Sequence, residues 1–290
     1  MNSTLPFNRV AIIGVGLIGG SWGLALKKRG VAARRVGCDR PEVLKQALAL
    51  GAIDEGEQDL ARAVRDADLI ILATPVGVIL DLLPQLKDKV SPRALVTDVG
   101  STKRLICHRA LEIFGDEPFF LGGHPLAGKE RSGLENAETA LLENACYALT
   151  PHSPDDLQDE RVRAFSALLE TLGARPFVTD ASTHDRAVAF LSHLPQLVSS
   201  GLASMIAEQG AEDFLPLELA ASGFRDVTRL AESPYAVWRD ICLTNVENIQ
   251  SALESLIEKL EAMKLHLSDR ELEQDFKQAL KLRERLREEK

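Results

Sequence analysis

Short apolar runs alternate with longer amphipathic stretches over the first 180 residues of the chain. Leu69–Thr74 is almost continuously apolar, which is typical of a strand buried on both faces of a sheet. Strands that alternate with helices predict an α/β fold, with a doubly wound parallel sheet and right-handed crossovers. The expected strands are Arg9–Ile13, Arg35–Cys38, Leu69–Thr74, Ala94–Thr97, Phe119–Leu121, Ala145–Leu149 and Arg175–Val178. The expected helices are a segment from about Leu17, then Glu42–Ala49, Leu60–Arg65, Val76–Leu83, Lys103–Phe114 and Arg161–Thr171.

The pattern changes after Asp180, where long stretches with helical apolar spacing replace the short runs. They contain few clusters of β-branched residues, so we expect this half to be entirely helical. The stretches are Ser182–Gln209, Pro216–Gly223 and Pro234–Leu267, followed by Ser268–Lys290 as a solvated amphipathic helix. The pattern therefore predicts two domains without a flexible spacer, residues 1–180 and residues 181–290.

The composition limits the possible partners. The chain has 290 residues, 45% of them hydrophobic, which is enough to bury a sizeable core. Its 34 basic and 43 acidic residues give a net charge of −9, which argues against nucleic acid or an anionic membrane as a partner. No uncharged apolar stretch approaches the roughly 20 residues that a membrane-spanning helix needs, and no secretory signal is visible. We therefore expect a soluble cytoplasmic protein.

Four cysteines lie far apart in the sequence: Cys38, Cys107, Cys146 and Cys242. They form no CxxC pair, and no cysteines and histidines cluster at the spacing of metal ligands. Free thiols in a reducing compartment account for this pattern better than disulfides do. The sequence therefore predicts neither a disulfide nor a bound metal.

Three glycines follow the first predicted strand in the pattern G-x-G-x-x-G. We expect Gly14 to make a tight turn, Gly16 to let a pyrophosphate approach the backbone, and Gly19 to let the helix pack closely on the strand. Leu17 and Ile18 begin a helix whose free N–H groups would face the phosphates. The motif alone is weak evidence, because a glycine turn can also be purely structural.

An acidic residue at the end of the second strand strengthens the dinucleotide interpretation. Asp39 lies 25 positions after Gly14, and a carboxylate at about this spacing accepts hydrogen bonds from the adenosine ribose. It would also repel a 2′-phosphate, so the motif favours NAD over NADP, although neighbouring Arg40 leaves NADP open. We therefore predict a Rossmann-type dinucleotide-binding domain with NAD as its cofactor.

Polar residues follow three further strands, at the edge where open α/β sheets bind their ligands. Thr74 and Pro75 would lie beside the dinucleotide. Ser101 follows the fourth strand, where it could face the ligands or cap the next helix. His124 follows two glycines at the end of the fifth strand, facing the expected nicotinamide. That position suits a general base, whereas a lone loop histidine is more often a surface residue.

The helical half contains two histidines and two arginines with a chemically suggestive spacing. His184 and His193 are nine positions apart, so they need not share a helix face, and His193 could also be a core residue. Pro195 is expected to bend the helix near His193. Arg225 and Arg229 are four positions apart, which is one face if the segment is helical. Arginine suits bidentate recognition of a carboxylate, and the alternative is a surface pair with Asp226.

Five motifs follow one another along the chain: GVGLIGGS, DVGSTK, GGHPLAGKERSG, HDRAVAFLSHLP and SGFRDVTRLAESPYAVWRDI. In this order they resemble the prephenate/arogenate dehydrogenases of tyrosine biosynthesis, from the first strand to about Ile241. The resemblance implies a C-terminal helical domain like that of 6-phosphogluconate dehydrogenase and a homodimer formed mainly by the helical halves. It implies an NAD-dependent oxidoreductase that oxidises and decarboxylates a cyclohexadienyl substrate, either prephenate to 4-hydroxyphenylpyruvate or arogenate to tyrosine.

The resemblance also implies roles for particular residues. His124 would take the proton of the ring C4 hydroxyl as hydride leaves for NAD, and loss of the ring carboxylate as carbon dioxide would give the aromatic ring. Ser101 would contact the same hydroxyl, orient His124 and lie against the cofactor. Arg229 would anchor a substrate carboxylate, and Arg225 would line the pocket entrance. The other residues expected around the substrate are His184, His193, Trp238, Lys129 and Glu130, the last of them near the gate of the pocket.

One position departs from the family pattern. Relatives that prefer prephenate commonly read HLPH, whereas this chain reads HLPQ, with Gln196 in the last position. A glutamine cannot carry the positive charge that a histidine offers near a pyruvyl group. We therefore expect Gln196 to relax selectivity or shift it toward arogenate, whose side chain carries an ammonium group.

Two other classes of protein remain as alternatives. β-Hydroxyacid and 6-phosphogluconate-type dehydrogenases pair similar domains, but they use a catalytic lysine in the second domain. This chain has no lysine between Lys129 and Lys259. A non-catalytic NAD sensor is the second alternative, and such a protein should have lost His124, Ser101 or Arg229, all of which are present.

Overall fold

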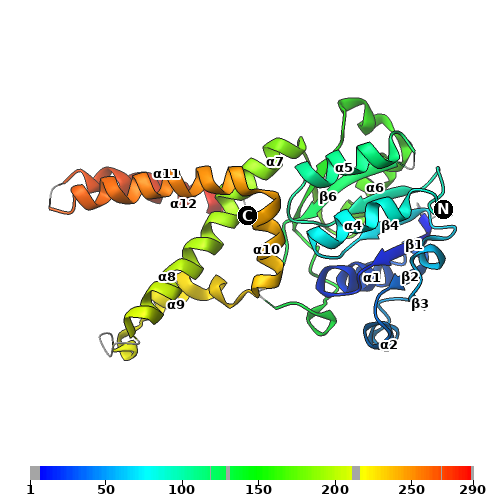
Figure 1. Ribbon diagram of the computed structural model, residues 1–290, viewed down its shortest axis with the longest axis horizontal. Helices are drawn as coiled ribbons and strands as arrows, with labels where there is room; N and C mark the ends of the chain where they lie inside the picture. Colours follow the sequence, from blue (N-terminus) through cyan, green and yellow to red (C-terminus); the bar gives the residue numbers. More distant parts are fainter. Residues whose placement is uncertain (1–6, 118, 129–130, 211–215, 269, 289–290) are drawn as a thin grey trace.

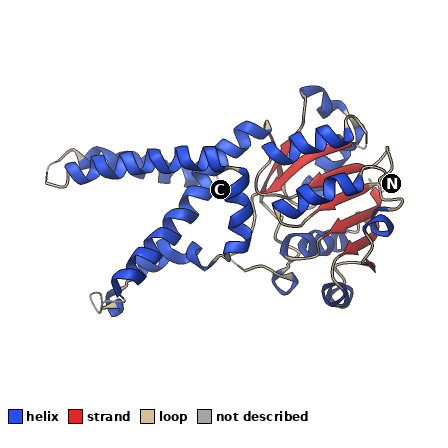
Figure 2. Ribbon diagram, in the orientation of Figure 1, coloured by secondary structure: helices blue, strands red, loops and turns tan. Residues whose placement is uncertain are grey.

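An eight-stranded, mostly parallel sheet forms one end of the molecule and a set of long helices forms the other (Figure 1, Figure 2). The computed structural model describes residues 7–117, 119–128, 131–210, 216–268 and 270–288. The strands are β1 (Phe7–Ile13), β2 (Ala32–Cys38), β3 (Glu55–Glu57), β4 (Leu69–Leu72), β5 (Leu95–Asp98), β6 (Phe119–Pro125), β7 (Cys146–Thr150) and β8 (Arg175–Val178). Their order across the sheet is β3-β2-β1-β4-β5-β6-β7-β8. The predicted α/β class, with a doubly wound sheet followed by a helical half, is confirmed.

The prediction of a parallel sheet is wrong at one pair of strands. β7 runs antiparallel to β6, and β8 is again parallel to β7. A parallel pair needs a crossover, usually a helix, whereas antiparallel strands can be joined by a simpler connection. In the described part of the β6–β7 connection the helical structure is the 3₁₀ turn η1 (Leu134–Asn136). The apolar run of a strand carries no information about its direction, so the sequence pattern could not reveal this reversal.

The sequence pattern also missed β3, the edge strand. Its three residues are Glu-Gly-Glu, and none of them is apolar. It pairs with β2 through backbone hydrogen bonds and is only partly buried. Because prediction of strands rests on buried apolar side chains, an acidic edge strand of this length leaves no signal.

Helices cover both faces of the sheet, so each face has its own hydrophobic core (Figure 2). In one core, Trp22 stacks on Phe165, and Tyr147 meets both rings edge-on. The other core contains Ile79 and Leu83, which lie one turn apart on the same helix. The helices of this half are α1 (Leu17–Arg29), α2 (Pro41–Leu50), α3 (Leu60–Val64), α4 (Val76–Leu86), α5 (Arg104–Phe114) and α6 (Glu160–Thr171). Burial of these side chains on both faces holds the carboxyl ends of the strands in fixed positions.

The second half is helical, as predicted, and it extends away from the sheet as two diverging arms (Figure 1). One arm contains α8 and α9, and the other contains α11 and α12. The elements are α7 (Ala181–Val188), the π-helical turn η3 (Ala189–His193), α8 (Leu194–Gly210), η4 (Leu217–Leu219), α9 (Ser222–Thr228), η5 (Arg229–Glu232), α10 (Tyr235–Thr244), α11 (Val246–Leu265) and α12 (Leu272–Glu288). No helix in the described ranges is long and apolar enough to cross a membrane.

The first long stretch of the helical half is interrupted where Pro195 enters it. A proline inside a helix has no N–H to donate, and its ring clashes with the carbonyl four residues earlier, here that of Leu191. The chain accommodates this with the π turn η3, which ends at His193. The expected bend near His193 is therefore present as a π turn between α7 and α8.

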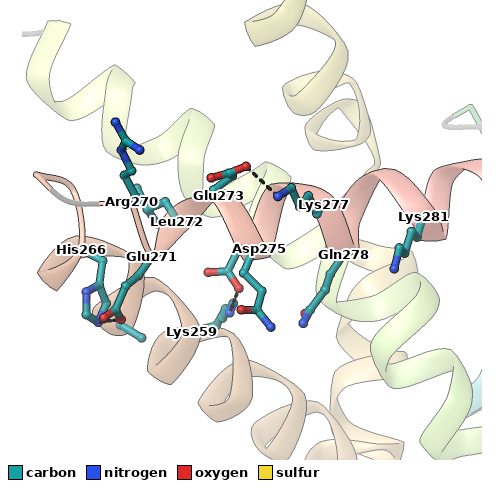
Figure 3. A pocket seen from close by; sticks show the side chains of 12 residues that line it. Lys259, His266, Arg270, Glu271, Leu272, Glu273, Asp275, Lys277, Gln278 and Lys281 are labelled. Atoms are coloured by element: carbon teal, nitrogen blue, oxygen red, sulfur yellow. Dashed lines mark hydrogen bonds and ion pairs between the residues drawn. The ribbon is translucent and has the colours of Figure 1, made fainter.

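The C-terminal segment forms the predicted amphipathic helix, α12, which folds back along α11. Charged side chains line the groove between these helices (Figure 3), and they include the pairs Lys259–Asp275 and Lys277–Glu273. These ion pairs are largely exposed to solvent, so each contributes little to stability. The groove lies on the arm rather than beside the sheet (Figure 1, Figure 3).

Candidate active site

Three of the helices that begin at the carboxyl edge of the sheet are α1, α4 and α5, and residues of the helical half accept hydrogen bonds from the first turns of α4 and α5. Asp240 of α10 accepts a hydrogen bond from the Gly77 N–H in the first turn of α4, at 2.9 Å. Asp185 of α7 accepts from the N–H groups of Lys103 and Arg104 at the start of α5, at 2.7 and 2.9 Å. These carboxylates satisfy N–H groups that would otherwise lack a partner, and each lies at the positive end of a helix dipole.

The N-terminus of the third helix, α1, is not capped by any side chain in the described part of the chain. Its N-cap is Gly16, which offers no side chain, and its first turn contains no acidic residue. A helix N-terminus with free N–H groups is a ready-made site for an anion such as a phosphate. Of the three helices, α1 is therefore the one available to a dinucleotide.

The glycine loop has the geometry that was expected of it. Gly14 has φ +91°, and a Cβ there would lie 2.7 Å from the Ala73 carbonyl oxygen. A Cβ on Gly19 would lie 2.0 Å from the Gly14 carbonyl oxygen, so only glycine lets α1 pack this closely. At Gly16, by contrast, a Cβ would meet no atom within 4 Å. The loop is tight on its inner side and open at Gly16, while Leu17 and Ile18 are half-buried at the start of α1.

Asp39 holds the glycine loop in place and retains capacity for a ligand. Its Oδ2 accepts from the Val15 N–H and its Oδ1 from the Arg40 N–H, both at 2.7 Å. A carboxylate has about four acceptor positions, so about two remain for ribose hydroxyls. The Arg40 side chain is 81% exposed and only 3.9 Å from the Asp39 carboxylate at its nearest. The structure therefore places both residues at the edge where the adenosine would lie.

Thr74 supplies an independent sign that a polar ligand belongs beside the glycine loop. Its methyl group lies 2.7 Å from a Cβ built on Gly14, so the side chain adjoins the loop. Its hydroxyl is buried and has no hydrogen-bond partner within the described chain. Buried hydroxyls are normally paired, and a bound dinucleotide would supply the missing partner. Pro75 is exposed next to it as the N-cap of α4.

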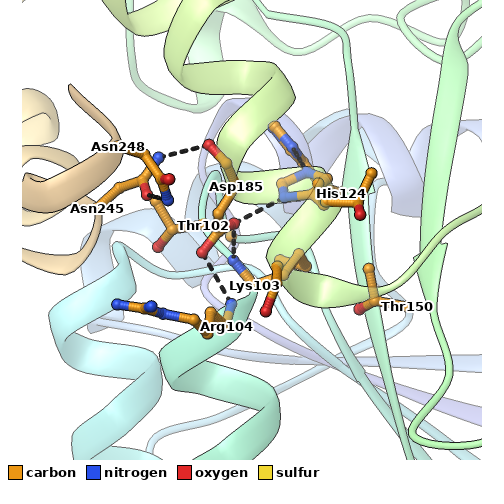
Figure 4. A network of polar contacts seen from close by, with 12 residues as sticks. Thr102, Lys103, Arg104, His124, Thr150, Asp185, Asn245 and Asn248 are labelled. Carbon is orange, nitrogen blue, oxygen red and sulfur yellow. Dashed lines mark hydrogen bonds and ion pairs between the residues drawn. The ribbon is translucent and has the colours of Figure 1, made fainter. Parts of the chain in front are cut away.

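His124 lies at the carboxyl end of β6 and is linked to the helical half by hydrogen bonds (Figure 4). Its Nδ1 is 2.9 Å from Nε2 of His184, and the two rings meet edge-on. His184 Nδ1 is in turn 2.8 Å from Oδ1 of Asp185. His184 and Asp185 are almost fully buried, whereas His124 is half-buried. The two nitrogens of His124 therefore have different surroundings, with Nδ1 held by the protein.

A fully buried ion pair lies beneath His124. The ammonium group of Lys103 contacts the Asp98 carboxylate and donates to the Gly123 carbonyl oxygen at 2.8 Å. Asp98 also accepts from the N–H groups of Gly100 and Gly123, at 2.8 and 3.1 Å. Buried charges are tolerated when they are paired and hydrogen-bonded in this way. The pair joins the ends of β5 and β6 and places a positive charge close to His124.

This environment keeps the His124 imidazole neutral. Burial lowers the pKa of His124 well below its usual range, and positive charge on His184 or Lys103 would lower it further. Burial likewise lowers the pKa of His193 to about 4. A neutral imidazole can accept a proton, which is the property required of a general base.

His193 and Trp238 join the same cluster from η3 and α10. The rings of His193 and Trp238 meet edge-on with centroids 5.8 Å apart. Asn245 Nδ2 lies 3.3 Å from His193 Nδ1 and donates to the Asp185 carbonyl oxygen at 2.8 Å. His193 is 1% exposed and is held by these partners, which fits the alternative that it is a core residue. Asn245 nevertheless links His193 to Asp185, because it contacts both residues.

Gln196 and the two arginines lie on the neighbouring arm. Gln196 is almost fully buried, and its Nε2 donates to the Leu230 carbonyl oxygen at 2.8 Å. Leu230 belongs to η5, which begins with Arg229. Helix α9 ends at Thr228, so the expected shared helix face does not continue from Arg225 to Arg229. Both arginines are exposed.

Of the remaining expected site residues, Ser101 is described and makes no hydrogen bond to the described part of this network. Ser101 is half-buried two residues before the N-cap of α5, which is Lys103, so it does not cap that helix. No hydrogen bond joins Ser101 to His124, although both residues are described. Lys129 and Glu130 lie outside the described residues.

Comparison with known families identifies the chain. The family model "Prephenate dehydrogenase, nucleotide-binding domain" matches residues 22–178, and "Prephenate dehydrogenase, dimerization domain" matches residues 180–282. The chain belongs to the prephenate dehydrogenase family. This finding confirms the family that the motifs predicted, and it does not favour the 6-phosphogluconate-type or sensor alternatives.

Individual members of the prephenate dehydrogenase family match nearly the whole chain. The prephenate dehydrogenase of Lactococcus lactis is 36% identical over 95% of this chain and 77% of its own length. A crystal structure of the A. aeolicus enzyme, in complex with hydroxyphenyl propionate and NAD+, has a TM-score of 0.86 and 31% identity, and covers 97% of this chain and 98% of that one. The structure of Synechocystis arogenate dehydrogenase has a TM-score of 0.74 at 31% identity, with the same coverage. The chain is thus an oxidoreductase, a dehydrogenase of tyrosine biosynthesis, as predicted.

The sequence alone did not reveal four polar residues of this prephenate dehydrogenase family member. Asp98 and Lys103 join the ends of β5 and β6, Asp185 binds the Lys103 N–H from the helical half, and Asn245 donates to the Asp185 carbonyl oxygen. Asp98 and Lys103 stand inside the quoted DVGSTK motif, and Asp185 follows His184, so the signal was present as their position in motifs. Asn245 lies outside the motifs and left no such signal.

Proposed function

We propose that this chain catalyses the NAD-dependent oxidative decarboxylation of a cyclohexadienyl substrate, prephenate or arogenate. The observation that carries the proposal is the position of His124, a half-buried imidazole at the carboxyl edge of the sheet, whose pKa burial lowers. The free N-terminus of α1 opens at the same edge, which suits a base and a dinucleotide acting on one substrate. Neither a 6-phosphogluconate-type dehydrogenase, with its catalytic lysine, nor a non-catalytic NAD sensor requires an imidazole at this position.

In the proposed mechanism, His124 holds the proton of the ring C4 hydroxyl while the hydride leaves C4. NAD, when bound, accepts that hydride. Loss of the ring carboxylate as carbon dioxide supplies the electron pair that completes the aromatic ring. The product is a phenol, so no net proton is released and His124 returns its proton to the oxygen. Ser101, half-buried after β5, is proposed to contact the same hydroxyl.

The dinucleotide is proposed to lie across the glycine loop. The N–H groups at the start of α1 would receive the pyrophosphate beside Gly16, where the backbone is open. Asp39 would accept the ribose hydroxyls, and the unpaired hydroxyl of Thr74 would gain a partner. Burial of the Asp98–Lys103 pair keeps water away from the adjoining strand ends, which strengthens electrostatic interactions there.

The substrate carboxylates are proposed to be bound from the helical half. Arg225 in α9 and Arg229 at the start of η5 are exposed, and a guanidinium binds a carboxylate through two parallel hydrogen bonds. His193 and Trp238 would form the wall of the pocket. Lys129 and Glu130 are proposed to act near its entrance, on the resemblance alone.

We further propose that Gln196 shifts selectivity toward arogenate. Because its Nε2 donates to the Leu230 carbonyl oxygen, the Oε1 atom remains an acceptor, which suits the ammonium group of arogenate. The variant Gln196→His should raise the ratio of kcat/KM for prephenate to that for arogenate. An unchanged ratio would refute this role of Gln196.

The helical half is proposed to form a homodimer. Its family model describes a dimerization domain, and the two arms expose large apolar side chains that a second copy would cover. Examples are Met205 at 51% exposure, Leu265 at 77% and Phe276 at 68%. The four cysteines, all free, fit the cytoplasm as the proposed compartment.

The proposed reaction is tested by incubating the purified chain with NAD and either prephenate or arogenate. We expect NADH absorbance to rise with at least one of the two substrates. If neither substrate gives NADH, and NADP in place of NAD gives no NADPH, the proposed function is wrong.

A further inference from the structure

A continuous line of hydrogen bonds runs from Asp185 through His184 to His124 and crosses the junction between the two halves. Asp185 and His184 belong to α7, whereas His124 belongs to β6. The contacts are 2.8 Å between Asp185 and His184 and 2.9 Å between the two imidazoles. Which atom donates in each of these hydrogen bonds follows from the contacts of the Asp185 carboxylate.

Asp185 is an acceptor at this end of the line. Its two oxygens accept the backbone N–H groups of Lys103 and Arg104 at 2.7 and 2.9 Å, at the positive end of α5. Hydrogen bonds from N–H donors stabilise the ionised form of a carboxylate. An ionised carboxylate only accepts hydrogen bonds, so the proton between Asp185 and His184 belongs to His184 Nδ1.

The protonation of His184 then determines that of His124. A neutral imidazole carries one proton, and in His184 that proton is on Nδ1, so Nε2 is a lone-pair acceptor. The contact between the two rings is therefore a hydrogen bond that the Nδ1–H of His124 donates to His184. With its own proton on Nδ1, neutral His124 presents a bare Nε2 as its remaining acceptor.

We propose that His184 and Asp185 are positioning residues that hold His124 in its Nδ1–H form, with Nε2 free to accept the proton of the substrate hydroxyl. The inference rests on the proposed function, because it assigns a proton acceptor to that reaction. When His124 takes the proton, its Nδ1–H continues to donate to His184. The negative charge of Asp185, on the other side of the His184 ring, then stabilises the positive charge on His124. The helical half thereby controls the protonation of a base that belongs to the nucleotide-binding half.

Two substitutions at His184 separate this role from simple packing. In His184→Gln, the side-chain oxygen can still accept from the Nδ1–H of His124. In His184→Leu, no acceptor remains, and His124 is free to carry its proton on Nε2, where it blocks the reaction. We expect His184→Leu to lower kcat by about 10²-fold or more, with the KM values for NAD and substrate close to wild type. We expect His184→Gln to recover most of the lost kcat.

Thr244→Val is the matched control, because it also removes a hydrogen bond between the two halves. Thr244 Oγ1 lies 2.8 Å from Thr102 Oγ1, outside the line of imidazoles. We expect the control to keep the wild-type kcat. Equal kcat values for His184→Leu and Thr244→Val would overturn the proposal, as would equal losses in His184→Leu and His184→Gln.

The protonation state of His124 can be read without any turnover, from imidazole ¹⁵N chemical shifts of the full-length, labelled protein. We expect a protonated Nδ1 and an unprotonated Nε2 for His124 in the wild type, and a loss of this preference in His184→Leu. A proton on Nε2 in the wild type refutes the inference, even if one of the variants does not fold. Because this readout needs no substrate, it also distinguishes failure of the inference from failure of the proposed function, which would appear as a wild-type protein without activity.

Discussion

Gly16 offers a test in which cofactor binding and folding respond differently to the same type of substitution. In Gly16→Ala, the added Cβ would meet no described atom within 4 Å. The residue has φ −86°, which is not the left-handed conformation that favours glycine, while its ψ of −146° lies beyond the β region and adds backbone strain of about 1 kcal/mol for alanine. The fold should therefore accept the methyl group, whereas a pyrophosphate that approaches this backbone should not.

The size of the two effects can be worked from the structure. Replacing glycine by alanine at a compatible position changes stability by no more than about 1 kcal/mol. Forcing an extra methyl group into a close contact typically costs about 1–3 kcal/mol. At about 1.4 kcal/mol per factor of ten, the Kd for NADH, which shares the pyrophosphate of NAD, should rise roughly 5- to 140-fold.

The assay is a calorimetric titration of each variant with NADH, together with thermal unfolding. Gly201→Ala in α8 is the matched control, since its Cβ would also meet no atom within 4 Å, far from the loop. Gly19→Ala should behave in the opposite way and lower Tm, because its Cβ would lie 2.0 Å from a backbone oxygen. A wild-type Kd for NADH in Gly16→Ala would refute the proposed position of the pyrophosphate.

Three further substitutions test individual site residues. His124→Asn should lower kcat by roughly 10²–10⁴-fold while substrate still binds, and steady-state kinetics with an unchanged kcat would remove His124 from its role. Arg229→Ala should chiefly raise the KM for the substrate, since the contact with its carboxylate is expected to be equally strong before and during reaction. Unchanged KM and kcat/KM values would leave Arg229 without a substrate contact. Asp39→Ala should lower the preference for NAD over NADP, measured as the ratio of their kcat/KM values, and an unaltered ratio would contradict the ribose contact.

The parts of the fold that sequence could predict are those with a periodic apolar pattern. The apolar run Leu69–Thr74 predicts a strand buried on both faces, and its residues do contribute to the cores on both sides of the sheet. The pattern of apolar side chains predicts neither the reversed direction of β7 nor the acidic strand β3. Strand direction does not depend on this pattern, and β3 pairs through its backbone without apolar side chains. The same limit applies to the π turn before Pro195, of which only a bend near His193 could be foreseen.

The candidate site could be predicted where one residue or a local motif carries the chemistry. The glycine loop and His124 are of this kind, because a turn or a strand end positions each of them. The line from His124 to Asp185 could not be predicted, because it joins residues about 60 positions apart that meet only after both halves have folded. The sequence singled out His184 as a pocket residue, and the structure shows in addition that it contacts His124 through Nε2.

The central claim is that one reaction at His124 couples hydride removal to loss of carbon dioxide. The most direct test measures NADH and carbon dioxide together in a single reaction mixture, with wild type and His124→Asn in parallel. We predict that the wild type forms the two products in equal amounts from prephenate or arogenate, and that His124→Asn forms both far more slowly. NADH formed without carbon dioxide, or equal rates in the two proteins, would contradict the claim.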